Sequence, residues 1–259
     1  MTAATSASTT PDLGPMPIWD LSDLYSAPNA PEVARDLARA ERDAQTLKEQ
    51  CQGKLADIAQ DGDKLGTIIK SYEDLSDLMG KLASYAGLYY YANQADPERA
   101  KFYGDTNEAL TRIGTDLIFF ELELNQIDEA VVAAAVKAPK LAKYAPWIED
   151  LRREKPYQLE ERLERLFTEK GQTSRGAFSR LFNETMTTLR FPVAGEAQPL
   201  TLEPTLNLLS HPDGARRKAG AEALAKVFGD NVRLFTLITN TLAKDKEISD
   251  RWRGFKDVA

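Results

Sequence analysis

The sequence predicts an all-α protein, a multi-helix bundle of antiparallel hairpins with one small β-hairpin near residues 188–202. Leu, Ala, Glu, Lys and Arg dominate the 259 residues, and all of them favour helices. Apolar residues recur at spacings of three and four along most of the chain, which is the period of one helical face. A hydrophobic content of 42% is sufficient for a packed core.

The first 31 residues are predicted to be mostly irregular. Residues 1–17 are rich in Thr, Ala, Ser and Pro and are expected to form a disordered leader. The large apolar residues between Ile18 and Tyr25 are expected to anchor an irregular segment onto the body. Pro28 and Pro31 suit a helix start, so residues 32–50 are predicted to form a polar helix.

Residues 63–92 show a strongly amphipathic helical pattern. One face carries the following residues: Leu75, Leu78, Leu82, Tyr85 and Tyr89. Tyr90 and Tyr91 widen this face into an aromatic cluster. Core and interface packing is the favoured role of the cluster, and substrate stacking is the alternative.

The next helix is predicted to be the centre of the first domain. Asp96 is expected to cap its start, with Pro97 at the first helical position. Apolar residues then lie on nearly all sides up to Leu124, and such a helix is normally buried. Shorter helices are expected over residues 128–137, around 147–151, over 159–167 with Gly171 as a C-cap, and over 175–189.

The helical pattern is interrupted once. Residues 188–193 and 199–202 are predicted to be two strands joined by a turn at Gly195-Glu196, marking the passage into a second domain. Ser210 is then expected to cap a helix over residues 212–228.

The last helix is predicted to carry a regular stripe and to run to the end of the chain, which suggests a cut sequence. The stripe consists of Leu234, Ile238, Thr241, Asp245, Ile248, Trp252, Phe255 and Ala259. Asp245 interrupts it, and an ionic contact with a Lys or Arg at its edge is the expected role. Without a partner surface, the apolar members of the stripe are expected to drive self-association.

Charge and cysteine content exclude several classes of protein. The chain has 33 basic and 40 acidic residues, a formal charge of −7, and its basic residues are dispersed. We therefore expect no nucleic-acid partner and no membrane partner. The single cysteine, Cys51, allows no intrachain disulfide. The first ten residues lack the pattern of a secretory signal, so a cytoplasmic location is expected.

The chain offers no set of residues that could form a catalytic site. His211 is the only histidine, so an H-E-x-x-H zinc motif is impossible, and its Ser-His-Pro-Asp context is typical of a helix start. Paired-carboxylate chemistry stays open, but solvated helix faces are the favoured role of the candidate carboxylates. These are Glu121, Glu123, Glu160, Glu161 and Glu164. The basic run 216–218 is expected to be a charged helix surface. We predict no catalytic, cofactor-binding or metal-binding residue in this chain.

Several strings, in order, resemble the N-terminal portion of the oligoendopeptidase F family, a branch of the thimet-oligopeptidase-like zinc metallopeptidases. They are residues 19–25 (WDLSDLY), 53–55 (GKL), 85–97 (YAGLYYYANQADP), 178–182 (FSRLF), the hairpin near Phe191, 244–247 (KDKE) and 251–255 (RWRGF).

The resemblance implies a mostly helical protein with a deep channel that cuts short peptides. Zinc in this family is held by the two histidines of H-E-x-x-H and a downstream glutamate, and the motif glutamate is the general base. None of these positions exists here, so zinc is implied for the full-length parent and none for this chain.

We therefore expect an N-terminal helical domain over residues 18–190 and a truncated start of the peptidase domain over 191–259. Together they would form part of the channel wall, inactive alone, with short peptides and the missing C-terminal peptidase region as partners. The alternative is a stand-alone helical peptide-binding or scaffold protein without catalysis.

Overall fold

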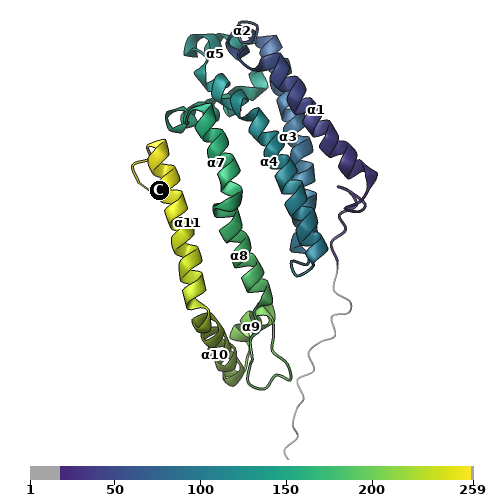
Figure 1. The fold of residues 1–259 in the computed structure, drawn as a ribbon, viewed down its shortest axis with the longest axis vertical. Helices are drawn as coiled ribbons and strands as arrows, with labels where there is room; N and C mark the ends of the chain where they lie inside the picture. Colours follow the sequence, from purple (N-terminus) through teal and green to yellow (C-terminus); the bar gives the residue numbers. More distant parts are fainter. Residues whose placement is uncertain (1–17, 258–259) are drawn as a thin grey trace, which may run out of the picture.

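The computed structural model describes residues 18–257, and this part of the chain is almost entirely helical (Figure 1). The all-α prediction is confirmed, whereas the predicted leader lies outside the described residues. The α-helices are α1 (Pro31–Cys51), α2 (Leu55–Ile58), α3 (Gly62–Tyr91), α4 (Pro97–Gln126), α5 (Glu129–Ala135), α6 (Ala145–Glu154), α7 (Glu161–Thr173), α8 (Arg175–Thr188), α9 (Leu202–Asn207), α10 (Gly214–Asp230) and α11 (Val232–Arg253). Short 3₁₀ segments are η1 (Ala142–Tyr144), η2 (Lys155–Tyr157) and η3 (Leu208–Ser210). Within residues 18–257, no helix combines the length and apolar character needed to cross a membrane.

The long helices α1, α3 and α4 lie side by side, and α2, α5 and α6 close one end of this bundle (Figure 1). α4 is its central element, as predicted, because it contacts α1, α2, α3 and α6 as well as α7. Phe119, Phe120 and Leu124 of α4 are fully buried in the main core. Tyr72 of α3 stacks on Phe120, with ring centroids 4.4 Å apart.

Aspartate caps set the starts of the two longest helices. Asp96 accepts hydrogen bonds from the backbone N–H groups of Glu98 and Arg99, and Pro97 is the first residue of α4, as predicted. Asp61 caps α3 in the same way through Asp63 and Lys64.

The segment before α1 is anchored by a buried tyrosine. Tyr25 donates a hydrogen bond from its hydroxyl to Asp36 Oδ2 at 3.0 Å, and its ring packs edge-on against Tyr85. The anchoring prediction is confirmed here but is wrong for Ile18 and Trp19. Their exposed fractions are 92% and 78%, because these two residues precede the first turn that packs on the bundle.

The second half of the molecule is an open pair of helical rods (Figure 1). α7 and α8 follow one another almost end to end, and α11 runs beside them in the opposite direction. α7 and α8 contain no buried residue, and Ile238 is the only buried residue of α11. A small core of Phe191, Val193, Leu208, Ala223 and Leu224 holds α9 and α10 at the far end.

The predicted β-hairpin is not formed. Phe191 and Leu200 make one isolated antiparallel bridge, with backbone N···O distances of 2.8 and 2.9 Å. The pairing cannot extend in one direction because α8 ends at Thr188 and α9 begins at Leu202. In the other direction, the Val193 carbonyl accepts from Glu196 N in a turn instead of pairing across.

Three predicted helix ends are also corrected. α11 does not run to the end of the chain but ends at Gly254, whose φ of 78° is the left-handed conformation that glycine adopts without strain. Phe255 N then bonds Asp250 O, which closes the helix. α7 continues past Gly171 to Thr173, and Asp213 rather than Ser210 caps α10 through Ala215 N.

Candidate functional site

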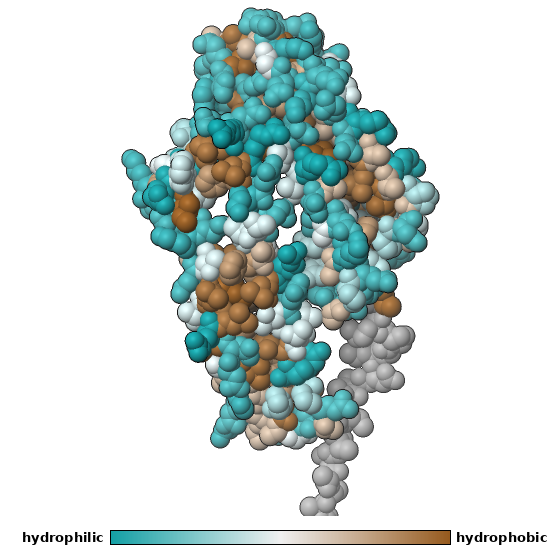
Figure 2. Space-filling model, viewed as in Figure 1, coloured by the Kyte–Doolittle hydropathy of each residue, from teal (hydrophilic) through white to brown (hydrophobic). Residues whose placement is uncertain are grey.

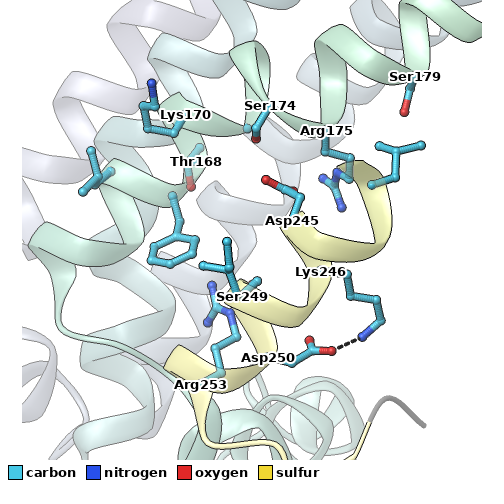
Figure 3. Close-up of a pocket in the computed structure, with 15 residues that line it drawn as sticks. Thr168, Lys170, Ser174, Arg175, Ser179, Asp245, Lys246, Ser249, Asp250 and Arg253 are labelled. Atoms are coloured by element: carbon cyan, nitrogen blue, oxygen red, sulfur yellow. Dashed lines mark hydrogen bonds and ion pairs between the residues drawn. The ribbon is translucent and has the colours of Figure 1, made fainter. Parts of the chain in front are cut away.

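A groove of about 820 Å³ lies between the α7–α8 rod and α11. Its walls are the apolar and polar side chains drawn in Figure 3. It exists because α7, α8 and α11 share few buried contacts, so their facing surfaces do not close on one another.

Both charges and apolar groups face the groove. Leu166 and Phe167 of α7 and Leu242 and Ile248 of α11 supply the apolar surface. Lys246 pairs with Asp250 one helical turn away on α11 (Figure 3). Such a mixed lining with a few charged groups suits a peptide, which presents both main-chain polar groups and apolar side chains.

Asp245 lines this groove and makes no ion pair within residues 18–257, so the predicted ionic contact is wrong. Arg175 of α8 and Asp245 of α11 both project into the space between the two helices (Figure 3). Lys170 and Arg175 also have no ion pair in the described part of the chain. Three charged side chains of the groove are therefore free to meet a ligand.

A bidentate ion pair joins α7 to α11 through Arg253, which lines the groove. Arg253 of α11 donates two hydrogen bonds to Glu164 of α7, both at 2.7 Å, and Leu159 N donates a third to the same carboxylate. Burial favours the neutral acid, but the Arg253 pair and the Leu159 N–H outweigh it and hold the pKa of Glu164 below its ordinary value. The hydrogen bonds that Arg253 donates to Glu164 raise the pKa of Arg253. Tyr157 and Phe255 stack beside this pair with centroids 4.0 Å apart.

Three of the other four candidate carboxylates have structural partners, and Glu160 is exposed. Glu121 accepts a hydrogen bond from the Tyr72 hydroxyl, and Glu123 accepts two from Gly53 N at 2.7 and 2.9 Å. Glu161 pairs with Arg165 on its own helix. These contacts tie helices and loops together. Glu121 and Glu164 line one small cavity, but each of them is already paired with a protein group, Glu121 with Tyr72 and Glu164 with Arg253.

The sequence around His211 is a helix start, as predicted. His211 Nδ1 accepts a hydrogen bond from Asp213 N at 3.0 Å, and Asp213 caps α10. Arg217 donates to the carbonyls of His211 and Pro212. Arg216 forms an ion pair with Glu196, so the basic run contributes to local structure as well as to surface charge.

The predicted tyrosine cluster divides into two parts. Tyr85 and Tyr89 pack against Phe102 inside the α3–α4 hairpin, which is the predicted core role. Tyr90 and Tyr91 instead meet Tyr103 beside a second, smaller cavity. That cavity could not be foreseen, because helices distant in sequence form its walls.

Residues 18–257 contain no cluster of three or more His, Cys, Asp or Glu side chains placed to hold a metal ion. Cys51 is buried, and burial is the main reason why its thiol pKa is raised. The residues present therefore do not fit a zinc site.

The family described as Oligopeptidase F matches residues 123–191, a range that includes α7 and α8 of the groove wall. The resemblance to the N-terminal portion of oligoendopeptidase F is confirmed. No curated protein matches the chain by sequence.

A solved oligoendopeptidase F has a fold similar to that of this chain. The oligoendopeptidase-F of Enterococcus faecium aligns with a TM-score of 0.76 and 19% identity, covering 87% of this chain and 45% of that one. The putative peptidase of Chlamydophila abortus aligns with a TM-score of 0.49 and 17% identity, covering 92% and 40%. The chain thus has the fold of a portion of the enterococcal enzyme and spans less than half of its length.

Proposed function

We propose that this chain is the N-terminal part of a zinc-dependent oligopeptidase that hydrolyses short peptides. In this proposal, residues 18–190 form an N-terminal helical domain and residues 191–259 are the start of the peptidase domain. The groove between the α7–α8 rod and α11 is part of the substrate channel wall. The observation that supports it most is that α7 and α8, which form one side of this wall, lie within the Oligopeptidase F match.

The proposed role of the wall is to bind short peptides and to exclude folded proteins. A groove lined by apolar side chains and by the unpaired Lys170, Arg175 and Asp245 can hold an extended peptide along its length. A folded protein is too wide to lie between two helical rods, so such a wall selects short peptides. Binding by the wall would contribute to KM, because it acts on substrate and transition state alike.

The zinc chemistry belongs to the region that follows in the parent protein. Only one histidine is present among all 259 residues, and no metal-holding cluster occurs in residues 18–257. We therefore propose that the chain is inactive alone and that the C-terminal peptidase region is its partner. A cytoplasmic location is part of the same proposal, and fractionation of the source cells would test it.

Peptidase activity on a quenched fluorescent peptide tests this proposal, measured with and without zinc for this chain and for a longer chain of the same gene. The proposal expects activity only in the longer, zinc-loaded chain. Activity of the 259-residue chain itself would contradict it. A stop codon directly after Ala259, with peptide binding and no cleavage, would favour the stand-alone peptide-binding or scaffold protein.

A substitution in the longer chain tests the wall. Ser249→Phe places a ring in the groove and is expected to raise KM several-fold with little change in kcat. Ser84→Phe, at an exposed position of α3 away from the groove, is the matched control and should change neither constant. An unchanged KM for Ser249→Phe would remove the groove from the substrate path.

A further inference from the structure

The smaller cavity, about 180 Å³ in volume, lies between the α3–α4 hairpin and the α7–α8 rod. Tyr90, Tyr91 and Tyr103 form one wall, and Ser179, Arg180 and Asn183 of α8 form part of the other. Ser179 also lines the large groove, so the two cavities adjoin the same helix. Pockets for drug-sized ligands have roughly 300–1,000 Å³. This cavity is therefore suited to the end of a chain and not to a whole ligand.

Its polar side chains have unused hydrogen-bonding capacity. Asn107, Asn183, Ser179 and Arg180 make no side-chain hydrogen bond or ion pair within residues 18–257. The hydroxyl of Tyr90 is buried and has no hydrogen-bond partner in the same part of the chain. Polar groups at a cavity wall that have no protein partner are normally satisfied by water or by a ligand.

The tyrosine wall is preorganised. Tyr90 and Tyr103 stack with ring centroids 4.8 Å apart and planes within 9°, and Tyr91 lies 6.0 Å from Tyr103. A hydrogen bond with Tyr103, together with burial, raises the pKa of Tyr91 to about 12. This hydroxyl therefore stays protonated near neutral pH. The wall offers apolar ring faces and neutral hydroxyl groups.

The charge of the lining is positive. Arg180 is the one ionised side chain that lines the cavity, because Glu184, which acts on Tyr90 from the same helix, is not part of its lining. A guanidinium pairs well with a planar carboxylate. Side-chain amides donate and accept at once, which matches the N–H and C=O of a peptide unit.

We propose that this cavity binds the C-terminal residue of a short peptide, with Arg180 on the terminal carboxylate, Asn107 and Asn183 on the last peptide unit, and the tyrosine rings against the side chain. This inference takes its ligand class from the proposed oligopeptidase function and adds recognition of a free chain end. A site of this kind favours short peptides, because a folded protein cannot insert its carboxyl terminus between two helices.

Calorimetric titration of the 259-residue chain tests the proposal with N-acetyl-Ala-Ala-Leu as a free acid, as its C-terminal amide, and as an amide with Glu in the last position. The free acid is expected to bind roughly tenfold or more tightly than either amide, since a charge-assisted pair is lost. Arg180→Gln should remove this preference, and Asn183→Ala should weaken binding of the free acid several-fold. Gln is as good a helix former as Arg, and Arg180 is exposed, so the fold is retained. Arg233→Gln, an exposed position of α11 that lines neither cavity, removes the same charge and should have no effect.

Several results would overturn the inference. Equal binding of acid and amide, an unchanged preference in Arg180→Gln, or equal binding of the Glu amide would each exclude recognition of the terminal carboxylate. Competition by inorganic phosphate at the same concentration as the peptide would indicate a general anion site instead. Zinc-dependent cleavage by the longer chain without any acid-over-amide preference would leave the oligopeptidase function standing and this inference refuted.

Discussion

The two halves of the molecule are built from similar helices but are packed very differently. The α1–α6 half surrounds a continuous core with fully buried residues on α1, α3 and α4. In the other half, α7 and α8 bury no residue and α11 buries one. Leu181, Phe182, Leu237 and Trp252 remain exposed there, and Figure 2 shows apolar patches on this face. The comparison indicates a rigid scaffold that carries an incompletely covered wall.

The largest expected loss of stability comes from a core substitution in the α1–α6 half, compared with a similar substitution in the other half. Phe120→Ala removes a ring that is 0% exposed in the main core and should lower the free energy of unfolding by about 3–5 kcal/mol. Phe182→Ala on α8, where the ring is 41% exposed, should cost only about 1–2 kcal/mol, because less apolar surface is buried there. Urea denaturation followed by circular dichroism measures both, and equal losses would contradict the comparison.

A smaller effect is expected where the wall is held by polar contacts. Glu164→Gln weakens the bidentate pair with Arg253 and should cost about 1–3 kcal/mol at pH 7. Glu149→Gln is the control, because the Glu149–Arg153 pair is exposed and should contribute less than about 0.5 kcal/mol.

The loss of stability caused by Glu164→Gln should become smaller as the pH falls. The folded-state pKa of Glu164 lies below the ordinary value of 4.5, so the carboxylate stabilises the fold above that pH. As the pH falls below about 4.5 towards the folded pKa, the carboxylate becomes protonated and its stabilisation is lost. The difference in the free energy of unfolding between wild type and Glu164→Gln should shrink over that range. A constant difference would show that the Glu164–Arg253 pair does not cause the loss of stability.

The smallest effect on stability is expected at Trp252, which is 53% exposed on α11. Trp252→Ser should change the free energy of unfolding by no more than about 1 kcal/mol but reduce self-association and binding of a hydrophobic dye. Analytical ultracentrifugation and dye fluorescence measure these changes. If the wild-type chain is already a monomer and binds no dye, the apolar stripe of α11 is not an uncovered interaction surface.

The elements that were predictable from sequence are those fixed by local chemistry. Asp96-Pro97 predicted the start of α4 because a cap and a fixed φ act within one turn. The burial of α4 followed from apolar residues on all its sides. Gly254 also ends α11 through local chemistry, but it lies inside the apolar stripe, whose period predicts a longer helix.

The parts that were not predictable depend on contacts between distant segments. The pattern at 188–202 predicts a hairpin, but its outermost residues belong to helices α8 and α9, so the strands do not form. The groove and the tyrosine cavity need α8 to lie against both α11 and the α3–α4 hairpin, and no spacing within one helix encodes that arrangement. Asp245 interrupts its apolar stripe in the sequence, but its place in the groove depends on the packing of α8 beside α11.

The central claim is that the α7–α11 half is a wall completed by another part of the parent protein. Amide hydrogen exchange of this chain and of the longer chain tests it most directly. The account predicts strong protection of α3 and α4 in both chains, weak protection of α8 and α11 in this chain, and a rise confined to α8 and α11 in the longer one. Equal protection of the two halves in this chain, or no rise at α8 and α11 in the longer chain, would contradict it.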